Sequence, residues 1–271
     1  MEFDIDSARV AGLLAPLRSD PRSAAVISDL DGTLAPIVER PGDTRVPSET
    51  RELLADLAGV FGLVAIVSGR RAADARSLVG LDQLTYIGNH GLERLDPGSG
   101  EQIVVAKEVE RGRDVERFAR AHLDRTMMDS IGLRIEDKGP ILALHWRGAP
   151  DEQRAAERAA EIATEASEQG LETHRGRKVL ELRPRLDVDK GTAITELLAE
   201  RSFVAALYAG DDRTDLDGFR ALRSMRSAGY LTASVTVGIA AAESPPEIAE
   251  AADIVVPDPP GFLAILAALA H

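Results

Sequence analysis

The chain has 271 residues, of which 44% are hydrophobic and 4% aromatic, and its formal net charge at pH 7 is −13. These values predict a core of aliphatic side chains in one large domain or two smaller ones. The acidic excess argues against nucleic acid or an anionic membrane as a partner, and the absence of cysteine excludes disulfides and thiolate metal sites.

The N-terminal stretch MEFDIDSARV has neither the basic nor the apolar region of a signal peptide. No apolar run reaches the ~18 residues that span a membrane. We therefore expect a cytoplasmic protein without a membrane partner. The segment before Pro21 fits either a helix packed on the core or a contact with another chain.

Apolar runs alternate with helical patterns in the first and last thirds of the chain. The runs predict buried strands over residues 24–29, 63–67, 84–87, 204–209, 235–239 and 254–256. The helical patterns lie over residues 48–57, 71–79, 190–200 and 262–269. Strands that are apolar throughout and alternate with helices are typical of a parallel sheet covered on both faces.

The middle of the chain has a different pattern. Residues 133–147 and 171–184 alternate polar and apolar side chains, which indicates an antiparallel sheet with one dry face. Helical patterns cover 107–125 and 151–168. The predicted fold class is therefore α/β, with a doubly wound parallel core over 1–92 and 185–271 and an inserted α+β unit over 93–184.

Two acidic clusters follow apolar runs directly, the stretch DLDGT at 29–33 and the stretch GDDRTDLDGF at 210–219. A calcium loop that starts at Asp29 would need Gly at Leu34 and Glu at Arg40, so that interpretation fails. A solvated turn stays open for either cluster alone. Because the carboxyl ends of parallel strands meet at one edge, where ligands bind, the two clusters together favour a site for a cation such as Mg²⁺.

Two further segments belong to the same predicted edge. Ser68-Gly69-Arg70 follows the strand at 63–67, and its hydroxyl and backbone N–H groups are suited to a phosphate oxygen. Lys190 opens a predicted helix and offers a point charge for a phosphoryl group. Taken alone, Ser68 also fits a helix N-cap, and Lys190 also fits a solvated lysine.

In this order, Asp29-Leu30-Asp31-Gly32-Thr33, Ser68, Lys190 and Gly210-Asp211-Asp212-x-x-Asp215 resemble the four motifs of the haloacid dehalogenase superfamily. The resemblance implies a Rossmann-like core and Mg²⁺-dependent phosphoryl transfer through an aspartyl-phosphate. It also implies a role for each motif.

By this resemblance, Asp29 is the nucleophile, and Asp31 gives a proton to the leaving oxygen and later takes one from water. Lys190, Ser68 and Gly69 would hold the phosphoryl oxygens. The metal ligands would be Asp29, the Asp31 carbonyl and Asp211. Asp212 and Asp215 would surround the metal and Lys190.

Within the superfamily, the sequence is similar to the trehalose-6-phosphate phosphatase family. The similarity rests on GNHGLE (88–93), DKGPILALHWR (137–147), GRKVLELRP (176–184) and the second acidic cluster. Leu216 departs from it, because the family usually carries Glu there. The resemblance implies a sugar-phosphate substrate, trehalose 6-phosphate. A sucrose, glucosylglycerol or mannosylglycerate phosphate, a phosphomutase, and a non-catalytic sensor remain as alternatives.

The inserted unit is expected to choose the sugar. Alternation within 141–147 and 176–184 predicts one polar sheet face that carries Arg147, Arg177 and Glu181. Such side chains offer donors and acceptors to sugar hydroxyls. The alternative is an ordinary solvated face with Arg–Glu pairs.

Overall fold

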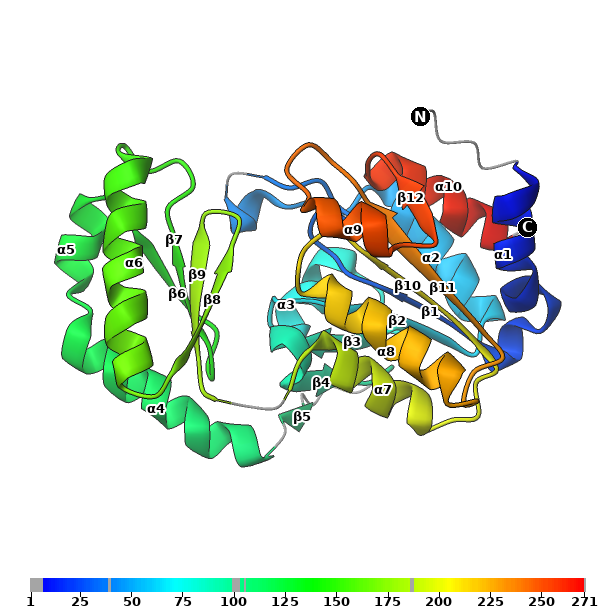
Figure 1. Ribbon diagram of the computed structural model, residues 1–271, viewed down its shortest axis with the longest axis horizontal. Helices are drawn as coiled ribbons and strands as arrows, with labels where there is room; N and C mark the ends of the chain where they lie inside the picture. Colours follow the sequence, from blue (N-terminus) through cyan, green and yellow to red (C-terminus); the bar gives the residue numbers. More distant parts are fainter. Residues whose placement is uncertain (1–6, 39, 99–102, 105, 186–187, 271) are drawn as a thin grey trace. The chain divides into compact units, whose positions relative to one another are not determined.

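The apolar segments form one eight-stranded sheet in the computed structural model, which describes residues 7–38, 40–98, 103–104, 106–185 and 188–270. The strand order is β12-β11-β10-β1-β2-β3-β4-β5 (Figure 1). Neighbours from β12 to β3 pair in parallel, and β4 pairs antiparallel with β3. The bounds are β1 (Ala24–Ser28), β2 (Leu63–Val67), β3 (Thr85–Gly88), β4 (Glu93–Leu95), β5 (Ile103–Val104), β10 (Ala205–Gly210), β11 (Ala233–Ile239) and β12 (Ile254–Val256).

Helices cover both faces of this sheet because its strands are apolar on both sides. Val26 of β1 belongs to the apolar cluster formed with α1, α2, α3 and α10, and Ile27 belongs to the cluster formed with α7, α8 and α9. The bounds are α1 (Ala8–Ser19), α2 (Ser48–Val60), α3 (Ala72–Val79), α7 (Lys190–Ala199), α8 (Asp215–Ser227), α9 (Pro246–Ala251) and α10 (Pro259–Ala270). The predicted α/β class with a doubly wound sheet is confirmed.

The middle of the chain forms a second, antiparallel sheet with the order β6-β7-β9-β8. Its apolar face, which includes Leu144 and Leu180, packs on α4, α5 and α6. The bounds are β6 (Arg134–Asp137), β7 (Leu142–His145), β8 (Glu172–Gly176), β9 (Val179–Arg183), α4 (Ala106–His122), α5 (Arg125–Ser130) and α6 (Glu152–Glu168).

The chain divides into two compact units. The core unit contains Met1–Val38, Gly42–Ile103 and Val188–His271, and the inserted unit contains Glu39–Pro41 and Val104–Asp187. The predicted insertion began at residue 93, but β4 hydrogen-bonds to β3, so the large sheet continues past that point. The insertion therefore begins later than the sequence predicted.

The N-terminal helix α1 packs on the core unit. Val10, Leu14 and Leu17, spaced three and four residues apart, are buried in its apolar cluster. This spacing places them on one side of a helix. Within the described part of the chain, none of the helices has the length and apolar character needed to cross a membrane.

Candidate active site

A buried lysine joins two carboxylates at the carboxyl edge of the eight-stranded sheet. The Nζ of Lys190, the first residue of α7, donates to Asp29 Oδ1 and to Asp215 Oδ1, each at 2.7 Å. Asp29 directly follows β1, and Asp215 begins α8 after β10. All three side chains are buried. Three predicted site residues, far apart in sequence, thus meet in one network.

Asp215 has partners on both carboxylate oxygens. Its Oδ1 also accepts from the Tyr208 hydroxyl at 2.5 Å, and its Oδ2 accepts from the backbone N–H groups of Asp211 and Asp212, each at 2.9 Å. These bonds fix the turn after β10 and orient Lys190. Asp215 therefore serves as a structural support for the site. Tyr208 is also a member of the site, and it was missed from the sequence because the apolar run VAALYA is typical of a core strand.

Three carboxylates form a group that fits a metal ion. One oxygen from each of Asp29, Asp211 and Asp215 lies within 4.8 Å of the others. The ammonium group of Lys190 balances one of these three negative charges, so the remaining two match a divalent cation. Since Asp215 is held by its own donors, Asp29 and Asp211 are the members best placed to bind a metal.

Gly32 allows the first acidic loop to approach Asp211. Its φ is +89°, in the left-handed region, and a Cβ at this position would lie 2.2 Å from Asp211 Oδ2. Thr33 Oγ1 donates to Asp211 Oδ1 at 3.2 Å. The Gly-Thr pair after the two aspartates therefore shapes the carboxylate group, and no side chain larger than glycine fits at the first position.

Burial and neighbouring charges shift the pKa values of this group in opposite directions. Burial raises the pKa of Asp29 well above its ordinary value, and the negative charges of Asp215 and Asp211 add to this against the opposing effect of Lys190. Burial alone would lower the pKa of Lys190, but its two carboxylate partners reverse the direction and raise it. Burial would raise the pKa of Asp215, yet Lys190 and Tyr208 lower it. Asp29 is thus the member that most needs a further cation.

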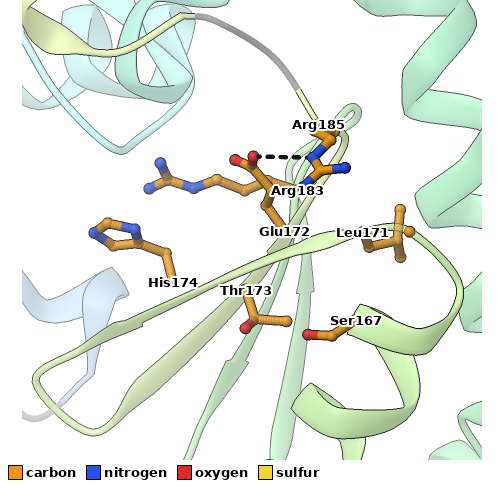
Figure 2. Close-up of a pocket in the computed structure, with 8 residues that line it drawn as sticks. Ser167, Leu171, Glu172, Thr173, His174, Arg183 and Arg185 are labelled. Atoms are coloured by element: carbon orange, nitrogen blue, oxygen red, sulfur yellow. Dashed lines mark ion pairs between the residues drawn. The ribbon is translucent and has the colours of Figure 1, made fainter.

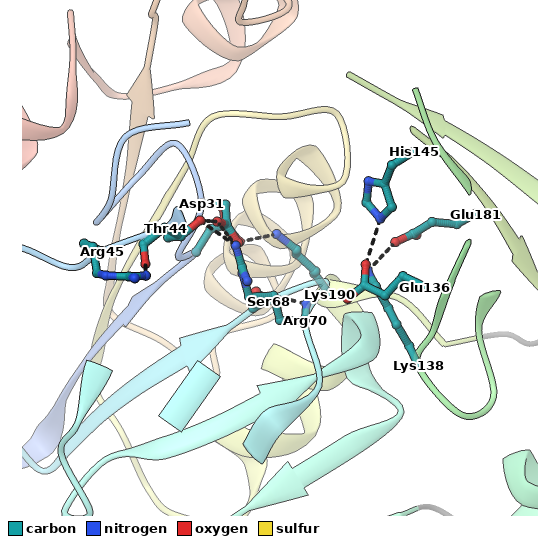
Figure 3. Close-up of polar contacts among 11 residues, drawn as sticks. Asp31, Thr44, Arg45, Ser68, Arg70, Glu136, Lys138, His145, Glu181 and Lys190 are labelled. Carbon is teal, nitrogen blue, oxygen red and sulfur yellow. Dashed lines mark hydrogen bonds and ion pairs between the residues drawn. The ribbon is translucent and has the colours of Figure 1, made fainter. Parts of the chain in front are cut away.

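Asp31, the predicted proton donor and acceptor, points its carboxylate at an arginine. Arg70 Nε donates to Asp31 Oδ2 at 2.6 Å, and Arg70 Nη2 donates to Asp31 Oδ1 at 2.7 Å (Figure 3). Thr44 Oγ1 donates to Asp31 Oδ1 at 3.3 Å. The sequence placed Arg70 in the phosphate loop without a role, and it did not indicate Thr44.

The predicted phosphate loop is hydrogen-bonded to the end of β3 and to the segment that follows it. Ser68 N donates to Ile87 O at 2.9 Å, and His90 N donates to Ser68 O at 3.0 Å. A Cβ at Gly69 would lie 2.6 Å from His90 Nε2, so a larger residue there would displace the histidine ring. Ser68 is buried at the end of β2, on the same sheet edge as Asp29.

The inserted unit has a polar sheet face. Lys138 Nζ donates to Glu181 Oε1 at 3.0 Å, and Arg183 Nη2 donates to Glu181 Oε2 at 2.5 Å. On the same face His145 Nε2 lies 2.7 Å from Glu136 Oε2 (Figure 3). Glu181 was predicted for this face, whereas Lys138 was missed although it lies in the stretch DKGPILALHWR.

Two of the residues predicted to contact the sugar lie in turns and not on the strands of this face. Arg177 and Lys178 form the turn between β8 and β9, where Lys178 has a φ of +58°. Arg147 lies in the turn after β7. The alternation was extended through two segments that have left the strands, and strand periodicity ends where a turn begins. The placement of Arg147 and Arg177 on the strand face was wrong.

The inserted unit also contains a pocket of about 350 Å³ between the end of α6 and strands β8 and β9. Arg185 Nε lies 3.8 Å from Glu172 Oε1. Figure 2 shows this ion pair, with His174 on the same strand as Glu172. The lining residues are Ser167, Gly170, Leu171, Glu172, Thr173, His174, Arg183 and Arg185. Arg183 connects this pocket to Glu181 on the polar face.

A family model described as trehalose-phosphatase matches residues 27–250. The chain belongs to this trehalose-phosphatase family. The matched span includes Asp29, the phosphate loop, the inserted unit, Lys190 and Asp211.

Relatives of the trehalose-phosphatase family have similar sequences and folds. The "Trehalose 6-phosphate phosphatase RA3" of Zea mays is 35% identical over 238 residues, which cover 82% of this chain and 66% of the maize protein. The solved Aspergillus fumigatus trehalose-6-phosphate phosphatase is 26% identical, with a TM-score of 0.63 and 97% of both chains covered. The C-terminal domain of the Candida albicans enzyme, at 23% identity and a TM-score of 0.77, shares the fold. The chain spans 56–66% of the length of the plant relatives that it matches.

Leu216, the departure from the family pattern, has a packing role in this trehalose-phosphatase family member. Its partly buried side chain packs against the apolar cluster that contains Ile27 and Phe219. An apolar residue at this position of α8 is therefore explained by core packing.

Proposed function

We propose that this chain is a Mg²⁺-dependent phosphatase that hydrolyses trehalose 6-phosphate to trehalose and inorganic phosphate. The observation that carries the proposal is the setting of Asp29, which is buried at the end of β1 between Lys190 and Asp211. A carboxylate in such a setting is suited to attack phosphorus, because the phosphoryl group brings charge that nearby cations stabilise. Family membership supports the same reaction.

In the first half of the reaction, an oxygen of Asp29 forms a bond to phosphorus and the bond to the sugar oxygen breaks. Asp31 gives that oxygen its proton. In the second half, the oxygen of water bonds to phosphorus, the bond between Asp29 and phosphorus breaks, and Asp31 takes the proton of the water. Lys190, Ser68 and the N–H of Gly69 hold the phosphoryl oxygens.

The residues present fit Mg²⁺. The carboxylates of Asp29 and Asp211 and the main-chain carbonyl of Asp31 would hold it, and oxygen ligands of this kind are those that Mg²⁺ prefers. When bound, the ion screens the negative charge of the nucleophile from that of the substrate. Asp212 and Asp215 would support it, Asp215 through the donors that orient the turn after β10.

The inserted unit is proposed to select the sugar. A disaccharide head group is neutral and rich in hydroxyls, so it requires side chains that both donate and accept. Glu181, Lys138 and Arg183 on the polar face supply both kinds of group. The pocket beside β8 is lined on the same face by Glu172 and His174, which pair with Arg183 and Glu181.

The test is release of inorganic phosphate from trehalose 6-phosphate, with and without Mg²⁺, beside glucose 6-phosphate and sucrose 6-phosphate. We expect Mg²⁺-dependent release from trehalose 6-phosphate, and a loss of more than about 10⁴-fold in Asp29→Asn, since a nucleophile is removed. Release from a different sugar phosphate alone would keep the reaction but overturn the substrate. Transfer of the phosphoryl group to another sugar position, without phosphate release, would identify a mutase.

A further inference from the structure

Arg70 connects the phosphate loop to Asp31. Its guanidinium makes two parallel bonds to the carboxylate, at 2.6 and 2.7 Å, and Arg70 Nη2 also donates to Thr44 Oγ1 at 2.7 Å (Figure 3). A planar guanidinium that binds both oxygens of a carboxylate fixes the direction of that carboxylate as well as its distance.

The two partners differ in how firmly they are held. Arg70 is anchored through its backbone, because its N–H donates to Ser68 Oγ at 3.2 Å and its carbonyl accepts from Asn89 N at 2.7 Å. The Arg70 side chain is 16% exposed and that of Asp31 is 36% exposed. Arg70 is therefore the fixed member of the pair, and it determines where the more exposed carboxylate points.

We propose that Arg70, assisted by Thr44, is the positioning residue for Asp31. This inference rests on the proposed phosphatase function. The two N–H bonds from Arg70 and the hydroxyl of Thr44 fix the direction in which the Asp31 carboxylate points. A group that gives or takes a proton must point at the atom that receives or loses it, so a misdirected Asp31 would transfer its proton more slowly.

Hydrolysis of the bond between Asp29 and phosphorus involves only water, Asp29 and Asp31 as reacting groups. The oxygen of water forms a bond to phosphorus, and the bond between phosphorus and Asp29 breaks with its electron pair returning to the Asp29 carboxylate. The proton that leaves the water passes to Asp31. Arg70 touches neither reacting bond, and it acts through the orientation of Asp31.

The experiment uses p-nitrophenyl phosphate with the full chain and Mg²⁺ in a rapid-mixing instrument. Nitrophenolate departs without a proton, so the first turnover reports attack by Asp29 and later turnovers report attack by water. For Arg70→Met we expect a first turnover within about threefold of the wild type, followed by steady turnover that is about 30-fold slower. This loss is smaller than the roughly 10²–10⁴-fold that proton transfer contributes, because Asp31 itself is still present. Thr44→Val should lose about threefold in steady turnover, as for one neutral hydrogen bond.

Two further variants distinguish positioning from other roles. Arg70→Lys keeps the charge without the two-bond geometry and should leave steady turnover at least about tenfold below the wild type. In Asp31→Asn, addition of Arg70→Met should cause no further loss, because the two residues act on one step. Equal losses in both phases for Arg70→Met and Arg70→Lys, or multiplying losses in the double variant, would overturn the inference. Absence of nitrophenolate release by the folded wild-type chain with Mg²⁺ would instead count against the proposed function itself.

Discussion

Lys190 in the core unit and Lys138 in the inserted unit both place a buried ammonium group against carboxylates, but their surroundings differ. The Lys190 side chain is 3% exposed and contacts Asp29 and Asp215. The Lys138 side chain is 8% exposed and contacts Glu181, which also binds Arg183. Around Lys190 the carboxylates outnumber the cation, whereas around Glu181 two cations share one carboxylate.

This difference in charge balance indicates different ligands. An excess of buried negative charge is costly until a metal ion joins it, so the edge with Lys190 is suited to metal-assisted chemistry on a phosphate. Around Glu181 the cations outnumber the carboxylate, so this part of the face does not attract a metal ion, and its side chains offer donors and acceptors to hydroxyl groups. The same kind of ion pair therefore suits chemistry in one unit and recognition in the other.

Of the two lysines, Lys190 should show the larger loss of activity and stability when it is substituted. Lys190→Met leaves Asp29 and Asp215 buried without their cation and removes a donor to the phosphoryl group. We expect kcat to fall by about 10³-fold, the magnitude of a lost oxyanion donor, and the melting temperature to fall as well. Steady-state kinetics and thermal unfolding measure both. Retention of kcat within tenfold would contradict the role given to this lysine.

Lys138→Met is the matched substitution in the inserted unit, and its effect should be smaller and of a different kind. We expect KM for trehalose 6-phosphate to rise about tenfold, as for one charge-assisted contact. Hydrolysis of p-nitrophenyl phosphate, which has no sugar, should stay within about twofold of the wild type. A comparable loss of kcat with both substrates would break the distinction between the two units.

The acidic edge of the sheet could be predicted from the sequence because it depends on short stretches of neighbouring residues. Asp29 and Asp211 each follow an apolar run directly, and parallel strands bring such positions to one edge. The strand limits at 63–67 and 254–256 also agree with the structure. These features depend on the hydrophobic pattern and on the order of strands and helices, and both can be seen in a single sequence.

The contacts that the sequence could not predict depend on side-chain reach between distant elements. The hydroxyl of Tyr208 meets Asp215 only because α8 turns back on β10, and the run VAALYA otherwise reads as core. Arg70 is 39 residues from Asp31 in the chain. Arg177 was misplaced because strand alternation was carried into a turn, whose position depends on pairing that the sequence does not state.

Tyr208→Phe tests the surroundings of Lys190 with a smaller expected effect. It removes one of the donors to Asp215 Oδ1 while Lys190 keeps its bond. We expect a loss of about 1.5 kcal/mol in unfolding free energy and a decrease of kcat of less than about tenfold, because Lys190 orientation loosens. Tyr86→Phe is the control, since its hydroxyl donates to Leu81 O at 2.7 Å and contacts none of the site residues named above. An equal loss of kcat in the control would make the Tyr208 effect one of general stability.

In stability, Asp29→Asn should produce the smallest change of these substitutions, and that change should be a gain. Because burial raises the pKa of Asp29 in the folded protein, ionisation of this carboxyl group as pH rises destabilises the fold. Without metal we expect the variant to melt about 2–4 °C higher, the effect of roughly 1 kcal/mol in a chain of this size.

The pH dependence of this gain has a defined sign. The penalty in the wild type builds up as pH rises from the unfolded value of about 3.9 through the raised folded pKa. The stability gain of Asp29→Asn should therefore grow as pH rises above about 4 and shrink as pH falls toward 4. Added Mg²⁺ should stabilise the wild type more than the variant, since it binds the folded site. Thermal unfolding in EDTA and in Mg²⁺ at several pH values measures these shifts. A variant that melts lower than the wild type in EDTA at pH 7 would contradict this prediction. It would mean that the attraction between Asp29 and Lys190 outweighs the cost of burying the charge. The carboxylate of Asp29 would then be as well compensated as that of Glu181 in the inserted unit.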